Sequence, residues 1–116
     1  NDDSERYNLL YGYLGRLELG VYFGNYGFAK DMAKKLIPLS DFDKSYTTNS
    51  LRLFFACITY ATLARRNKKQ KQKRRAYLGR ANRRYKDLSR LCEIKGMNSI
   101  HRCLIMKAVM KTVNGH

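Results

Sequence analysis

The chain has 116 residues, of which 44% are hydrophobic and one is proline, which excludes compositional disorder and predicts one all-α domain over residues 1–116. Its net charge of +15 is uneven, because residues 1–64 carry seven cations and seven acids whereas residues 65–90 carry thirteen cations and one acid. The longest apolar run, from Leu53 to Ala64, is shorter than the roughly 20 residues of a membrane span, so no span is expected. The first residues lack an initiator methionine, and we expect the chain to be part of a longer one.

A first helix is predicted over about residues 4–23, where apolar side chains recur every three or four positions. Ser4 is its expected N-cap. Gly12, Gly15 and Gly20 each lower the helix propensity by roughly 1 kcal/mol relative to alanine. Because glycine has no side chain, we expect these positions to admit a closely packed neighbour.

A tight turn is predicted at Gly24 and Asn25, where glycine supplies a left-handed end for the first helix. The second helix is expected over about residues 26–37, and Pro38 ends it. Residues 38–46 form the longest predicted loop.

A third helix is predicted over about residues 49–67, with Thr47 or Thr48 as its N-cap. Apolar residues cover almost its whole circumference, which is typical of a helix at the centre of a domain.

A polar link over residues 67–72 precedes a fourth helix, which extends to about Cys92 with an apolar stripe on one face and cations on most of the remainder. Gly96 is the expected stop signal, and a last helix is expected to begin at Asn98 or Ser99. We therefore expect two antiparallel hairpins, with the fifth helix closing their open end. The predicted core includes Leu14, Leu17, Val21, Ala29, Ala33, Leu36, Leu51, Phe54, Phe55, Ile58, Leu78, Ala81, Tyr85, Leu88 and Leu104.

Three cysteines, Cys57, Cys92 and Cys103, leave one unpaired in any disulfide scheme. All three lie in apolar helical stretches, which favours reduced, buried thiols in an intracellular protein, cytoplasmic rather than nuclear. Their spacing matches no zinc-binding pattern.

The segment from Gly24 to Ala29 resembles the turn inside a tetratricopeptide repeat, in which a glycine, an Asn or Asp and an aromatic residue precede a small alanine. Tyr13 lies where that family carries an aromatic residue early in its first helix. The family pattern departs at Leu17, where a small residue is usual, and at Gly20, where an aromatic residue is usual. The resemblance implies antiparallel helical hairpins, with the alanine at the point where the helices cross.

Residues 51–92 are similar to repeat-type tails of large algal proteins that join an ATPase module to signalling domains. The similarity depends on Leu63-Ala64-Arg65-Arg66 and on Arg74-Arg75-Ala76-Tyr77. The chain itself contains no glycine-rich phosphate-binding motif, so the resemblance concerns the tail and not the ATPase module. We expect a scaffold or recognition module.

Several interpretations of the basic segment remain open. Its cations can form a solvated face, bind an acidic protein surface, or bind the phosphates of a nucleic acid. Two further alternatives are a basic helix gripped by a calmodulin-like clamp at Leu78, Tyr85 and Leu91, and a nuclear import signal over residues 68–75. We expect an acidic protein partner, with nucleic acid as the alternative. The predicted partner-binding residues are Arg65, Arg66, Lys68, Lys69, Lys71, Lys73, Arg74, Arg75, Arg80, Arg83 and Arg84.

No catalytic group, metal site or cofactor is expected. His101 and Cys103 are two positions apart, and such residues point in different directions on a helix. Asp41 and Asp43 share a loop without a third ligand, so they are expected to act as loop and capping residues. The end helices of a short repeat domain also expose apolar surface, through which the chain could form a homodimer.

Overall fold

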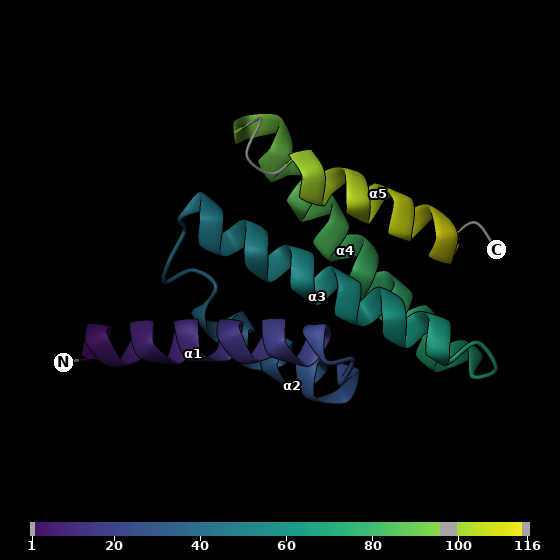
Figure 1. Cartoon of the computed structure of the whole chain (residues 1–116), viewed down its shortest axis with the longest axis horizontal. Helices are drawn as coiled ribbons and strands as arrows, with labels where there is room; N and C mark the ends of the chain where they lie inside the picture. Colours follow the sequence, from purple (N-terminus) through teal and green to yellow (C-terminus); the bar gives the residue numbers. More distant parts are fainter. Residues whose placement is uncertain (1, 96–99, 115–116) are drawn as a thin grey trace.

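A computed structural model describes residues 2–95 and 100–114, and over these residues the chain is helical with no strand. Figure 1 shows the helices in chain order. They are α1 (Asp2–Tyr22), α2 (Tyr26–Leu36), the short 3₁₀ helix η1 (Ile37–Leu39), α3 (Tyr46–Arg66), α4 (Lys71–Lys95) and α5 (Ile100–Asn114). The all-α class and the five α-helices expected from the sequence are therefore confirmed within the described residues.

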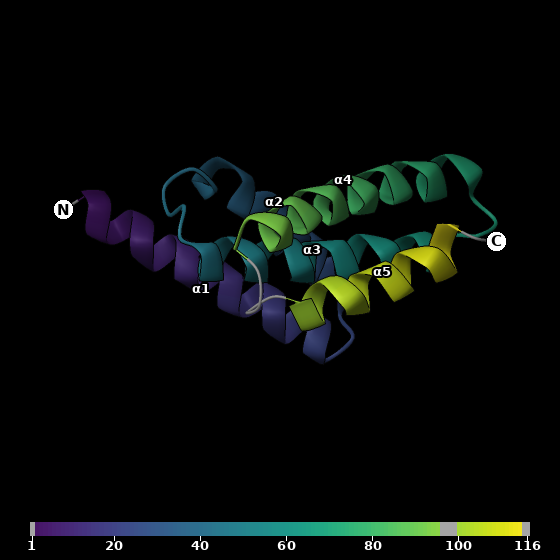
Figure 2. The same cartoon turned by 90° about the horizontal axis from the view of Figure 1, so that it is seen from above.

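Successive helices run antiparallel, so that α1 pairs with α2 and α3 pairs with α4 (Figure 1). α3 contacts all four of the other α-helices, and α5 packs on both α3 and α4. Seen from above in Figure 2, α3 lies between α2 and α4 on one side and α1 and α5 on the other. The helix with the most apolar circumference therefore occupies the centre, as expected.

The α1–α2 hairpin closes tightly through one glycine in its turn and another in α1. Gly24 has a φ of +75°, the left-handed conformation predicted for it. Asn25 caps α2, because its side chain accepts a 3.2 Å hydrogen bond from the backbone N–H of Phe28. A Cβ added at Gly20 would lie 3.1 Å from the Cβ of Ala29, so these two residues mark the crossing point.

The expectation of close packing was wrong for Gly12 and Gly15, because nothing lies within 4 Å of a Cβ added at either position. The predicted caps of two helices were also wrong. Ser4 lies inside α1, which begins at Asp2. Ser45 caps α3, its hydroxyl accepting a 3.4 Å hydrogen bond from the N–H of Thr48, so the helix begins before either predicted threonine.

The core confirms most of the predicted stripes. Seven of the expected residues are buried: Leu14, Leu17, Ala29, Ala33, Leu36, Ala81 and Leu88. Seven more are half-buried and pack against them: Val21, Leu51, Phe54, Phe55, Ile58, Leu78 and Tyr85.

Leu104 is the exception, because its side chain is 59% exposed. α5 carries apolar residues on more than one face, and it turns Met106, Met110 and Val113 into the core instead. The stop signal at Gly96 and the start at Asn98 or Ser99 lie outside the described residues.

Two of the three cysteines are joined, which corrects the expectation of reduced thiols. Cys92 of α4 and Cys103 of α5 form a disulfide, with their Cα atoms 6.9 Å apart. Cys57 remains a free thiol and is buried, as expected.

Candidate functional site

Eight of the eleven predicted partner-binding cations, from Arg65 to Arg75, lie around the turn between α3 and α4. Asn67 ends α3 by donating its backbone N–H to the carbonyls of Leu63 and Ala64, at 3.1 and 3.3 Å. Its side-chain amide donates a second hydrogen bond, of 2.7 Å, to the carbonyl of Leu63. The chain then reverses within residues 67–70, so that cations from the end of α3 and the start of α4 lie side by side. We call the exposed members of this group that contact no aromatic ring the basic turn cluster: Arg65, Lys68, Lys69, Lys71, Lys73 and Arg75.

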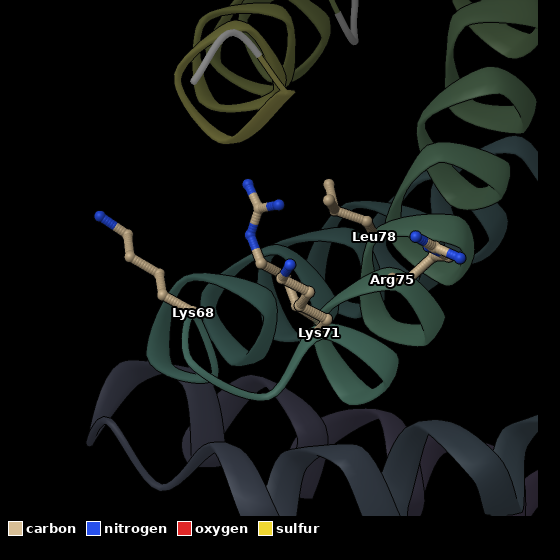
Figure 3. A pocket seen from close by; sticks show the side chains of 5 residues that line it. Lys68, Lys71, Arg75 and Leu78 are labelled. Atoms are coloured by element: carbon tan, nitrogen blue, oxygen red, sulfur yellow. The ribbon is translucent and has the colours of Figure 1, made fainter.

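A hollow of about 410 Å³ opens beside this cluster, and Figure 3 shows it from close by. Lys68, Lys71, Arg75 and Leu78 line it together with Arg74. In the figure, the amine of Lys68 and the guanidinium of Arg75 lie at opposite ends of the hollow. Among the described residues, its lining contains no acid, so the hollow favours an anionic group beside an apolar floor.

Arg74 connects this hollow to the last helix. Its guanidinium donates a 3.2 Å hydrogen bond to the carbonyl of Val113, in the last turn of α5. The carbonyl end of a helix carries a partial negative charge, which a guanidinium stabilises. Arg74 therefore has a structural partner within the chain, although it was predicted to bind a partner protein.

Three other predicted cations lie over aromatic rings of the chain itself. The guanidinium carbon of Arg66 is 4.7 Å from the ring centre of Tyr26. Those of Arg80 and Arg84 are each 5.7 Å from the ring centre of Tyr60, which is buried. Such contacts stabilise a fold by roughly 0.5–1 kcal/mol at exposed sites and by more where water is excluded.

Arg83 differs from these two neighbours, because it is exposed on the outer side of α4. The predicted binding residues therefore do not form one surface. The structure brings the basic turn cluster together with Arg74, and it separates from them the two arginines that cover Tyr60.

The aromatic residues near the basic segment also have internal partners. Tyr77 of α4 stacks on Tyr60 of α3, with ring centres 6.3 Å apart. On α2, the amine of Lys30 lies 5.8 Å from the ring centre of Tyr77. This contact links the two hairpins, and Lys30 is not among the predicted partner-binding residues.

The positive charge of the segment is left largely without ion pairs. Across residues 2–95 and 100–114, the structure pairs Arg90 with Asp87 at 4.0 Å, and the cations of residues 65–84 make no ion pair. Burial, and then the nearby guanidinium of Arg84, lower the pKa of Arg52 in α3. Because the described cations of residues 65–84 have no acidic partner, an anion near them is favoured.

The thiol of Cys57 and the carboxylate of Asp43 have the chemistry of catalytic groups, but both make hydrogen bonds within the fold. Burial raises the pKa of the Cys57 thiol to about 12, and this thiol donates to the carbonyl of Ala81 at 3.3 Å. Asp43 accepts hydrogen bonds from Tyr11, Ser45 and Thr48, so it holds the loop to the start of α3, whereas Ser45 is the residue that caps this helix. The side chain of His101 lies outside those described.

Within the described residues, no group of three or more His, Cys, Asp or Glu could hold a metal ion, and no helix is long and apolar enough to cross a membrane.

The chain was compared with protein-family models, with curated proteins and with solved structures, and it matches none of them.

Proposed function

We propose that this chain is a non-catalytic interaction module that binds an acidic surface of another protein through the basic turn cluster. The observation that carries the proposal is the hollow between Lys68 and Arg75, which four cations line together with Leu78. Cations held this close repel one another, and an anionic partner relieves that repulsion.

An acidic protein is favoured over nucleic acid by the aromatic residues. Proteins that bind single strands offer exposed rings on which bases stack. Here Tyr77 is stacked on Tyr60, and Tyr85 is half-buried against the core. The apolar floor that Leu78 supplies matches an aliphatic side chain of a protein better than a phosphate.

The helix packing supports a repeat-like architecture for the module. α3 packs on both helices of the first hairpin, and α5 packs on both helices of the second. Stacked hairpins of this kind bury a continuous core and present broad surfaces, rather than one deep pocket.

The test is a pair of titrations with labelled probes, one an acidic peptide and the other a single-stranded oligonucleotide, at about 50 and 200 mM salt. We expect the peptide to bind, and the variant Lys68→Glu/Lys71→Glu to weaken its binding by about tenfold or more. The control Lys34→Glu/Lys44→Glu makes the same change of charge at exposed positions away from the turn, and it should bind like the parent chain. Tight binding of the oligonucleotide with a steep salt dependence, and none of the peptide, would contradict the proposal.

A further inference from the structure

A second hollow lies farther along α4, on the side that faces α5. It has a volume of about 360 Å³ and is lined by Tyr85 of α4 and by Lys107, Met110, Lys111 and Asn114 of α5. Met110 is buried and Tyr85 half-buried, so they form an apolar floor, whereas both lysines are exposed at the rim. The composition therefore repeats that of the first hollow, with cations around an apolar floor.

The two hollows follow one another along α4, and we call the surface that contains both of them the groove between α4 and α5. Leu78 in the first hollow and Tyr85 in the second are seven residues apart on α4, which places them on one face and about 10 Å apart along the helix axis. Between them, Asn82 of α4 and Asn114 of α5 exchange hydrogen bonds of 3.1 and 3.4 Å. Arg74 closes the far end by its hydrogen bond to Val113.

This spacing indicates the shape of the occupant. Residues i and i+7 of a helix lie on one face, two turns apart, and helices that bind in grooves use such positions as apolar anchors. Two apolar floors about two turns apart thus match one partner helix that lies along the groove. The phosphate backbone of a nucleic acid offers no comparable pair of aliphatic groups.

The charges indicate the chemistry of the occupant. Six cations line the two hollows, and among the described lining residues there is no acid. A second copy of this chain would bring another net charge of +15 against them, which disfavours a homodimer through this face. A helix with carboxylates beside its apolar anchors complements both the floors and the rims.

We propose that the groove between α4 and α5 binds an acidic amphipathic helix of the partner protein, with apolar side chains at i and i+7 in the two hollows. The inference rests on the proposed function and adds that Lys107 and Lys111, outside the basic turn cluster, form part of the binding surface. It also specifies that the segment of the partner that binds is a helix, whereas the proposed function requires only an acidic surface.

The test uses two synthetic acidic peptides of identical composition. The first has leucines at i and i+7, and in the second the latter leucine is moved to i+9, which places it on the opposite face of a helix. We expect the second peptide to bind about tenfold more weakly, because one apolar side chain loses its hollow. The first peptide should also gain helical circular dichroism on binding.

The matched protein variants are Lys107→Glu/Lys111→Glu and Lys34→Glu/Lys44→Glu. All four lysines are exposed, so both variants should keep the helical spectrum of the parent chain. The groove predicts that the first variant weakens binding by about tenfold or more. It predicts no change for the second.

The proposed function requires that Lys68→Glu/Lys71→Glu weakens binding. If that holds, but the two peptides bind equally and Lys107→Glu/Lys111→Glu has no effect, the groove is not the binding site of a helix and the inference is overturned. Failure of both peptides to bind would overturn the proposed function along with the groove. Self-association that Lys107→Glu/Lys111→Glu abolishes, or oligonucleotide binding with the same sensitivity, would assign the groove to another occupant and overturn the inference.

Discussion

Gly20 of α1 and Ala29 of α2 pack so closely that a Cβ on the glycine would lie 3.1 Å from the Cβ of the alanine and 3.2 Å from its Cα and backbone nitrogen. Backbone atoms cannot move aside as the end of a flexible side chain can. We therefore expect Gly20→Ala to destabilise the domain by about 1–3 kcal/mol, although alanine favours helix.

The matched control is Gly15→Ala, in the same helix, where nothing lies within 4 Å of the added Cβ. This change should instead stabilise the domain by about 0.5–1 kcal/mol. Thermal unfolding of the two variants compares them directly, since about 1 kcal/mol shifts the midpoint by several degrees. Equal melting temperatures would show that the hairpin does not cross at Gly20.

Asp43 makes the start of α3 sensitive to acid. A 2.5 Å hydrogen bond from the Tyr11 hydroxyl, followed by the bond from the Ser45 N–H, lowers the pKa of Asp43 from 3.8 to about 2. A lowered pKa in the folded state adds stability above the unfolded value, and that stability is lost as the pH falls. The parent chain should therefore lose this contribution between about pH 4 and pH 2.

Asp43→Asn should lower the melting temperature at neutral pH, and its difference from the parent chain should shrink over that acid range. Asp41→Asn removes the same charge from the same loop, but among the described residues Asp41 accepts no hydrogen bond. It should change the melting temperature less. A constant difference between Asp43→Asn and the parent chain at every pH would contradict the assigned cause.

Cys57 should be chemically inert in the folded protein. The side chain is buried, and burial raises its pKa to about 12, so very little thiolate forms at mildly alkaline pH. With the Cys92–Cys103 disulfide intact, we expect iodoacetamide to modify the protein once after denaturation and not in the native state. Rapid alkylation of the native chain, read by mass spectrometry, would show that the thiol is accessible.

Arg74 and Arg75 are adjacent cations with different roles. Arg74 donates to the carbonyl of Val113 at the end of α5, whereas Arg75 is exposed at the hollow. Arg74→Ala should therefore destabilise the domain by about 1 kcal/mol. Arg75→Ala should leave its stability nearly unchanged, although both variants lose one charge, and identical unfolding curves for the two would remove the structural role given to Arg74.

Local signals in the sequence predict much of this fold. The left-handed turn at Gly24 follows from residue type, and the central position of α3 follows from its apolar circumference. The inward stripe of α5 could not be predicted, since several of its faces are apolar, and Leu104 was placed in the core while Met106 and Met110 were missed.

The candidate site could be predicted only in part, because the packing of the helices decides which of the cations face solvent. A run of cations shows that positive charge is concentrated, but the direction of each side chain depends on which helix packs against which. Arg80 and Arg84 cover Tyr60, and Lys107 of α5 joins the groove, because of contacts between residues far apart in sequence. The pairing of Cys92 with Cys103 has the same origin, since it follows from how α5 lies on α4.

The most direct test of the central claim is a map of backbone amide shifts, measured by NMR while an acidic amphipathic peptide is titrated into the labelled chain. We predict that the shifts concentrate from Lys68 to Tyr85 and from Lys107 to Asn114, around the two hollows. Shifts concentrated instead at Tyr22 and Phe23, whose side chains are 81% and 74% exposed at the far end of α1, would contradict the claim.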